Sequence, residues 1–349
     1  MPEFQIAKIL TLFTLAFIFA ILWTPILTHY LYKYKLGKNI RNSGKTPIFS
    51  KLHAHKAGTP TMGGILIWLT LLILIILFSF VGDLLNWDLL RDLNFLSRSE
   101  TLLPLGALIA TALVGLFDDW LDVRGKGEKG GGGLNIGHRL FIYAIIALIG
   151  SLWFYFKLDW TVLHVPFFGS FEIGWWYIPI FIFVIISTAF SVNESDGLDG
   201  LAGGTLITSY VAFGVIAFAL GRYDLAAFCG VIIGGLLAFL WFNIPPARFY
   251  LGDTGAMSLG VTLAIIAMLT NYVILLPIIG LLFVFESLSV ILQVAHKKIK
   301  KRKLFFSTPI HHHFQAIGWS EPKIVMRSWV ISAIAAAIGV ILFLLDRGL

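Results

Sequence analysis

The chain of 349 residues is 58% hydrophobic, 15% aromatic and only 13% charged, with a mean hydropathy of +0.87. Soluble domains are roughly 45–50% apolar and about 25% charged, so this composition excludes an ordinary soluble globule and indicates an integral membrane protein. The formal net charge of +7 suits either nucleic acid or a membrane surface, and the single cysteine, Cys229, excludes an intramolecular disulfide.

Ten apolar segments are each close to the roughly 20 residues that a bilayer-spanning helix needs. We expect them to be the transmembrane helices of an all-α, multi-pass protein with one transmembrane domain over residues 1–349. The ninth contains Pro277, Gly280 and the internal Glu286, so we expect it to be kinked or broken. In chain order the segments are 6–28, 62–81, 102–117, 139–156, 175–192, 203–220, 226–242, 256–271, 273–295 and 329–345.

Basic residues gather in alternate loops. The loops after the first, third, fifth, seventh and ninth spans hold all 26 Lys and Arg residues except Lys8, Arg91, Arg98, Lys157, Arg222 and Arg347. The positive-inside rule places such loops in the cytoplasm and both termini outside. This topology accounts for the net charge, and without a helix-turn-helix, zinc-finger or aromatic RNA-binding signature we expect no nucleic-acid partner. The expected cytoplasmic loops are about 29–61, 118–138, 193–202, 243–255 and 296–328.

The first two of these loops carry polar clusters at the membrane face. The stretch HAHKAGTPTMGG (53–64) predicts a rigid turn into a glycine-rich helix start, where backbone N–H groups and Lys56 could bind an anion. The alternative is a loop whose glycines only permit close helix packing. The stretch LVGLFDDWLD (113–122) puts Asp118 beside Asp119. Adjacent carboxylates repel, so either one has a raised pKa or binds a cation, or both are solvated acids at a span end.

The next two loops add further carboxylates. In NESDGLDGLAGG (193–204), Asp196 and Asp199 would share a face if the turn were helical, and the glycines would admit a ligand closely. Glu194 could simply be solvated. In NIPPARFYLGDTGAMSLG (243–260), Asp253 lies just before a span, where its alternative role is to cap the helix.

The fifth loop is strongly basic and ends in consecutive histidines. The basic run at 297–303 indicates a cytoplasmic loop that contacts anionic membrane lipids. His311, His312 and His313 cannot all face one metal, so zinc is poorly supported, whereas phosphate contact or proton transfer suits them. Carboxylates from three loops are the hard oxygen ligands that Mg²⁺ or Mn²⁺ prefers. The residues therefore predict metal-assisted phosphate chemistry at the inner membrane face.

Six motifs in this order resemble those of the polyprenyl-phosphate N-acetylhexosamine-1-phosphate transferases over nearly the whole chain. They are GTPTMGG, FDDW, NESDGLDGLAGG, NIPPARFYLGDTG, ESLSVILQV and TPIHHHFQAIGW followed by EPKIVMRSW. Within that superfamily, PIHHHF with its following GW is most similar to the phospho-N-acetylmuramoyl-pentapeptide transferases. The resemblance implies a bacterial cytoplasmic-membrane enzyme that joins UDP-MurNAc-pentapeptide to undecaprenyl phosphate, giving lipid I and UMP in peptidoglycan synthesis. It also implies Mg²⁺, with Mn²⁺ as a substitute, and a homodimer is one assembly open to it. We expect direct attack by the lipid phosphate, because Asp118 beside a second acid and a metal suits a base, and a phospho-aspartyl intermediate is the alternative.

The resemblance assigns roles to individual residues. Asp118 is the expected base or phosphate-activating carboxylate, and Asp119 is its catalytic partner. Asp253 is expected at the metal together with Asp118 and Asp196. A catalytic role is also expected for His311, His312 and His313. The residues expected to bind substrate are Lys56, Thr61, Lys126, Arg139, Asn193, Asp196, Gly197, Leu198, Asp199, Asn243 and Tyr250.

One departure from the family and two alternative functions stay open. Asp122 stands where the family has a lysine, so that phosphate contact is either missing or supplied by Arg124, Lys126 or Lys129. The first alternative function is transfer of GlcNAc-1-phosphate or a related sugar phosphate, which segment 304–319 would distinguish. The second is divalent-cation transport, although transporters place their ligands at the midplane and here only Glu286 lies inside a span.

Overall fold

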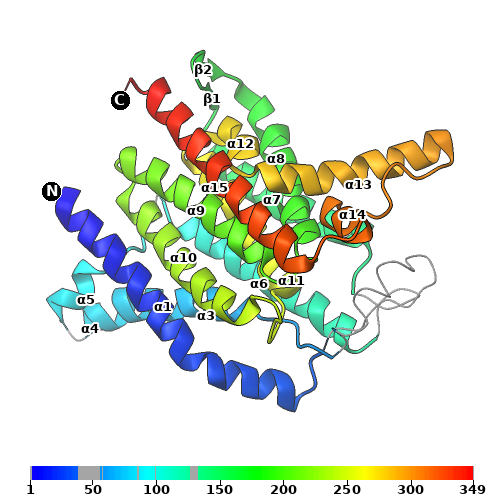
Figure 1. Cartoon of the computed structure of the whole chain (residues 1–349). Helices are drawn as coiled ribbons and strands as arrows, with labels where there is room; N and C mark the ends of the chain where they lie inside the picture. Colours follow the sequence, from blue (N-terminus) through cyan, green and yellow to red (C-terminus); the bar gives the residue numbers. More distant parts are fainter. Residues whose placement is uncertain are drawn as a thin grey trace.

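The computed structural model describes residues 2–37, 56, 58–84, 86–98, 100–125 and 133–348. Each of the ten predicted spans is helical (Figure 1). The long helices are α1 Pro2–Lys33, α3 Ile65–Ile76 with its π-helical extension η2 Leu77–Val81, α6 Leu102–Val123, α7 Ile136–Lys157, α8 Tyr177–Ser195, α9 Leu201–Ala219, α10 Tyr223–Asn243, α11 Gly252–Leu269, α13 Leu281–Lys300 and α15 Glu321–Asp346. The short elements are α4 Gly82–Leu84, α5 Asp88–Asp92, η3 Gly174–Trp176, η4 Val273–Leu275, α12 Leu276–Ile279 and α14 Ile310–Ala316, with strands β1 Val162–Val165 and β2 Gly169–Glu172.

Within the described residues, eight helices are long and apolar enough to cross a membrane, or nine if the bent pair 273–300 counts as one span. The stretch Ile65–Val81 is a shorter apolar helix. These helices confirm the prediction of an all-α, multi-pass membrane protein. Which end of the bundle faces the cytoplasm stays a prediction from the distribution of basic residues.

The centre of the bundle is α11, which is buried along nearly its whole length. A helix that is apolar all round belongs in the interior, and α11 packs against α6 and α8. Small residues bring the backbones close, because a Cβ on Gly260 would overlap Ala189 of α8. This packing fixes the first turn of α11, which carries Asp253, beside the last turns of α6 and α8.

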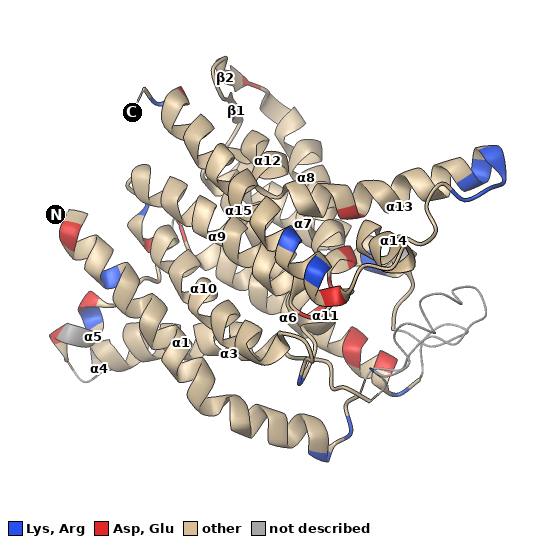
Figure 2. Ribbon diagram, in the orientation of Figure 1, with Lys and Arg blue, Asp and Glu red and all other residues tan. Residues whose placement is uncertain are grey.

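The ninth predicted span is broken, as expected. Its two parts, Val273–Ile279 and Leu281–Lys300, meet at an angle of 81° next to Gly280. The longer part, α13, projects from the body of the molecule (Figure 1). Its far end carries the basic run of residues 297–303 (Figure 2).

Two features of the fold differ from the predictions. The segment after α7 forms an antiparallel hairpin of β1 and β2, whose His164 contacts Asp346 at the end of α15 at 2.7 Å. The helices also run further into the predicted cytoplasmic loops than hydropathy indicated, since α6 ends at Val123 and α8 at Ser195. Hydropathy detects only the apolar part of a helix, so the polar last turns were wrongly assigned to loops.

Candidate active site

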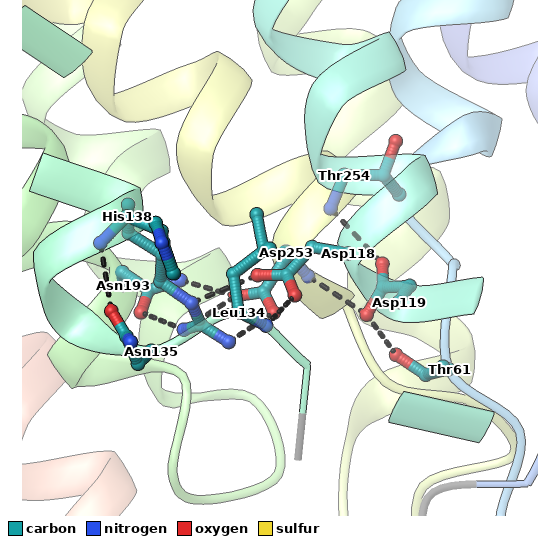
Figure 3. Close-up of polar contacts among 10 residues, drawn as sticks. Thr61, Asp118, Asp119, Leu134, Asn135, His138, Asn193, Asp253 and Thr254 are labelled. Carbon is teal, nitrogen blue, oxygen red and sulfur yellow. Dashed lines mark hydrogen bonds and ion pairs between the residues drawn. The ribbon is translucent and has the colours of Figure 1, made fainter. Parts of the chain in front are cut away.

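Five segments that are distant in the sequence meet at one end of the bundle (Figure 3). They are the end of α6, the start of α7, the end of α8, the start of α11, and the stretch 56–64 before α3. Most of the predicted site residues lie here, and the ribbon in Figure 2 shows several acidic residues, in red, in this part of the molecule.

Arg139 joins two of the predicted catalytic carboxylates. Its Nε lies 2.8 Å from Oδ2 of Asp118, and its Nη2 lies 2.9 Å from Oδ2 of Asp253. Its Nη1 donates to Oδ1 of Asn193 at 3.1 Å, and the Asn193 amide donates to Asp253. The guanidinium therefore neutralises part of the charge where α6, α7, α8 and α11 converge.

Asp118 is held by more than this ion pair. It is fully buried, and its Oδ1 accepts a hydrogen bond from the backbone N–H of Leu134. Its Oδ2 lies close to Arg139 but receives no hydrogen bond from the described residues, since the Nε–H is not directed at it. Arg139 gives this oxygen a counter-charge but no directed hydrogen bond, and a buried oxygen in that state is a suitable ligand for a metal cation.

Asp119 has a different environment from its neighbour. Its carboxylate accepts hydrogen bonds from the backbone N–H groups of Asp253 at 3.1 Å and Thr254 at 3.0 Å, and from the Thr61 hydroxyl at 3.0 Å. These amides belong to the first turn of α11, whose N–H groups have no partners within the helix. Asp119 thus holds the start of α11 against α6, and its geometry is that of a positioning residue.

The alternative role of Asp253 as the helix cap is wrong. The N-cap position is Leu251, and Asp253 lies inside the first turn of α11 with its side chain directed at Arg139 and Asn193. The backbone N–H groups at the start of this helix donate to Asp119 instead. The Asp253 carboxylate therefore faces the site.

Lys56 forms a second ionic group. Its Nζ lies 2.6 Å from Oδ1 of Asp199 and 2.5 Å from Oε1 of Glu321. Glu321 also accepts the backbone N–H of Asp199 at 2.7 Å, and the other Asp199 oxygen accepts from the Ala247 N–H. This group joins the first, third, fourth and fifth predicted loops.

The turn that carries Asp196 and Asp199 is not helical, so the two acids do not share a helix face. Asp196 ends α8, and its Oδ2 accepts the backbone N–H of Gly252 at 3.2 Å. Asp199 instead faces Lys56. Glu194 is half-buried and interacts electrostatically with Tyr143, so the alternative of a freely solvated Glu194 is also wrong.

The GTPTMGG stretch serves close packing. The N–H groups of Gly63 and Gly64 donate to the carbonyls of Tyr250 and Leu251 at 2.7 and 2.8 Å, which leaves neither amide for an anion. A Cβ on Gly64 would overlap the backbone of Gly255. Between the two alternatives left open by the sequence, the structure favours the packing role for these glycines.

The three histidines point in different directions. Nδ1 of His311 lies 2.8 Å from Glu286, and its buried Nε2 faces Gly197 without a hydrogen bond from the described residues. His312 contacts Gln315 at 2.8 Å, and His313 stacks on Phe306. Only His311 is aimed at the turn that carries the acids.

The remaining predicted residues divide by environment. Both ends of the Asn243 side chain bind backbone, with Oδ1 accepting from Gly200 and Nδ2 donating to Phe249. Leu198 is buried in a small apolar cluster with Leu201 and Ile324. Tyr250 lies near Lys56, and burial raises the pKa of its phenol, which keeps it a neutral hydroxyl at neutral pH. The prediction for Lys126 lies outside the described residues.

The donor set at Asp118 and Asp253 fits Mg²⁺. Both are carboxylates, the amide oxygen of Asn193 adjoins them, and one Asp118 oxygen lacks a hydrogen bond from the described residues. Three carboxylates act on Arg139, those of Asp118, Asp119 and Asp253, and together they leave a local excess of negative charge. Within the described residues, however, no three His, Cys, Asp or Glu side chains form a ready metal group, so the metal roles of Asp118, Asp196 and Asp253 all stay predictions.

Sequence reasoning missed three residues of this region. Glu321 holds both Lys56 and the Asp199 amide, Asn135 caps α7 by accepting the His138 N–H at 2.8 Å, and the Leu134 amide binds Asp118. Glu321 begins the EPKIVMRSW motif, which could have directed attention to it. The Leu134 contact uses only backbone, which leaves no signal in side-chain chemistry.

Comparison with known proteins gives matches along the chain. Residues 101–271 match glycosyl transferase family 4, and residues 56–67 match the phospho-N-acetylmuramoyl-pentapeptide-transferase signature 1. A phospho-N-acetylmuramoyl-pentapeptide-transferase of Chloroflexus aggregans is 38% identical over 98% of this chain and 91% of its own. Proteins of the same name from Geobacillus sp. and Listeria welshimeri are 37% and 36% identical, over 93% and 94% of this chain and 95% and 96% of theirs.

Proposed function

The chain belongs to the phospho-N-acetylmuramoyl-pentapeptide-transferase family, and from this premise we propose that it transfers phospho-MurNAc-pentapeptide from UDP-MurNAc-pentapeptide to undecaprenyl phosphate in peptidoglycan synthesis. The observation that carries the proposal is the group formed by Asp118, Arg139 and Asp253 at one end of the transmembrane bundle. A soluble nucleotide sugar and a membrane-bound lipid phosphate can both reach such a position.

The proposed reaction is one displacement at phosphorus. An oxygen of the lipid phosphate attacks the phosphorus that bears the sugar and forms a new P–O bond. The bond from that phosphorus to the oxygen shared with the UMP phosphate breaks, and UMP leaves with that oxygen and its electron pair. Such a reaction depends mainly on positioning and on stabilising charge on the phosphoryl oxygens.

The charged residues have separate roles in positioning the substrates and stabilising their charge. The Arg139 guanidinium supplies positive charge between Asp118 and Asp253, where two anionic substrates would approach. Asp118 is the carboxylate suited to accept a proton from the attacking lipid phosphate or to align it. Asp118 and Asp253, with the Asn193 oxygen, would hold Mg²⁺, which when bound would reduce repulsion between the phosphates and stabilise charge on the leaving UMP.

We expect the nucleotide to bind beside the turn 196–200. Lys56 holds this turn through Asp199, and Glu321 holds both. The buried ring of His311 packs against Gly197 in the same turn, so it supports the backbone beside which we expect the nucleotide to bind. Asp119 accepts hydrogen bonds from Thr61 and from the start of α11, and so holds the start of this helix in place.

The experiment measures UMP release by the purified protein from UDP-MurNAc-pentapeptide in the presence of undecaprenyl phosphate. Asp118→Asn is expected to abolish release without unfolding the protein, because it removes the carboxylate that we propose activates the lipid phosphate. Asp88→Asn, at an exposed aspartate on α5, is the matched control and is expected to retain activity. An Asp118→Asn variant with most of the wild-type turnover would contradict the assignment.

A further inference from the structure

Arg139 contacts each of the three side chains that the proposed function assigns to the metal. Its Nε lies 2.8 Å from Oδ2 of Asp118, and its Nη1 and Nη2 lie 3.3 and 2.9 Å from the two oxygens of Asp253. Its Nη1 also lies 3.1 Å from Oδ1 of Asn193. The three oxygen-bearing side chains come from α6, α11 and α8 and meet at one place (Figure 3). The guanidinium therefore lies where their oxygens converge.

The guanidinium fits one of these partners better than the other. With Asp253 it forms two parallel hydrogen bonds, which is the favoured pairing of arginine with a carboxylate. Toward Asp118 it supplies charge alone, because neither Oδ2 of this buried carboxylate nor Nε of Arg139 has a hydrogen bond from the described residues. A metal ion has no donor direction to satisfy, so the contact with Asp118 suits a metal ion better than it suits a guanidinium.

A metal ion and the Arg139 guanidinium cannot share these oxygens. Two cations held by the same carboxylates would repel each other strongly, since charges interact at short range with little screening in a buried site. Arginine does not relieve such repulsion by losing its proton, because its guanidinium stays charged in proteins. The side chain must move instead, and it is 18% exposed, so one edge of it is open to solvent.

We propose that Arg139 occupies the metal site as a removable counter-ion, and that it exchanges Asp118 and Asp253 for a substrate phosphate when the metal binds. The inference rests on the proposed function and adds the order in which the charges pair. Once released, Arg139 presents the planar set of donors that matches phosphate oxygens. The exchange leaves no charge unpaired, since the carboxylates bind the metal and the guanidinium binds the phosphate.

Metal binding in the absence of substrate tests the occupancy. Arg139→Gln keeps a polar side chain but removes the charge, so Mn²⁺, followed by electron paramagnetic resonance, should bind about tenfold more tightly than to wild type. The control is Arg248→Gln, at an exposed arginine that lies over the Phe242 ring in the loop before α11. Because exposed charges are screened by salt, this variant should bind Mn²⁺ within about twofold of wild type. Equal or weaker binding by Arg139→Gln, or no Mn²⁺ binding by either protein, would overturn the proposal.

Chemical modification of the wild-type protein measures the release of Arg139 itself. Phenylglyoxal modifies accessible arginines, and mass spectrometry of the digested protein gives the rate at each position. We expect Mg²⁺ to raise the rate at Arg139 by at least about threefold, because the metal shifts the side chain out of the site. The rate at Arg248 should not change. A rate at Arg139 that Mg²⁺ lowers or leaves unchanged would refute the exchange alone, whereas a wild-type protein without transfer would refute the proposed function.

Discussion

Replacing Asp119 by asparagine separates its structural role from the chemistry assigned to Asp118. Asp119 is 2% exposed and accepts the backbone N–H groups of Asp253 and Thr254 together with the Thr61 hydroxyl. An amide of the same shape turns one acceptor into a donor, which leaves a buried N–H unsatisfied at a cost of about 1–3 kcal/mol. Loss of the negative charge at the start of α11 adds up to about 2 kcal/mol. The expected destabilisation is therefore about 1–5 kcal/mol.

The assay compares the apparent Tm of the two neighbouring variants in detergent. With about 2–4 °C per kcal/mol, Asp119→Asn should lower Tm by roughly 2–20 °C. Asp118→Asn should lower it far less, because the loss of the Arg139 ion pair is offset by relief of repulsion from Asp253. Equal Tm values for Asp119→Asn and wild type, or an equal loss in Asp118→Asn, would refute the positioning role of Asp119.

Four further predictions follow from the same contacts. Chelation by EDTA should stop transfer and Mg²⁺ or Mn²⁺ should restore it, since the proposed ligands are oxygens; turnover that survives thorough chelation would contradict the metal role. Glu321→Gln should raise KM for the nucleotide sugar about fivefold and leave kcat within about twofold, because Lys56 and the 196–200 turn lose a charged partner; steady-state kinetics with an unchanged KM would argue against this. Gly64→Ala should lower Tm, because its Cβ would overlap the Gly255 backbone. Gly106→Ala in α6 is the control and should leave Tm unchanged, because its Cβ would meet open space. Equal Tm values for the two variants would contradict the packing role. A cysteine introduced at Lys301 should resist impermeant maleimide added to intact cells and react after lysis; labelling from outside would reverse the topology.

The helices were predictable from the sequence because hydrophobicity alone determines which segments can cross a bilayer. The break at Gly280 was also predictable, since Pro277 and Glu286 interrupt an otherwise apolar segment. The hairpin 162–172 was not predicted. Its strands are too short to be stable alone, and contacts of Asp346 with His164 and with the backbone N–H of Phe167 attach it to the rest of the protein.

The members of the candidate site were largely predictable, but their individual tasks were not. The paired aspartates look identical in FDDW, yet Asp118 faces Arg139 and Asp119 faces the backbone of α11. The direction of a side chain at the end of a helix depends on what packs against it, which a single sequence does not record. The same reason explains why the packing role of GTPTMGG emerged only from its hydrogen bonds to residues 250–251.

The most direct test of the proposed function is a parallel transfer assay with the purified wild-type protein. Undecaprenyl phosphate is supplied with either UDP-MurNAc-pentapeptide or UDP-GlcNAc in the presence of Mg²⁺, and the lipid products and UMP are measured together. We predict equal amounts of UMP and lipid-linked phospho-MurNAc-pentapeptide from the first donor, with little product from the second. Efficient transfer from UDP-GlcNAc alone, or UMP release without a lipid-linked product, would contradict the proposed function.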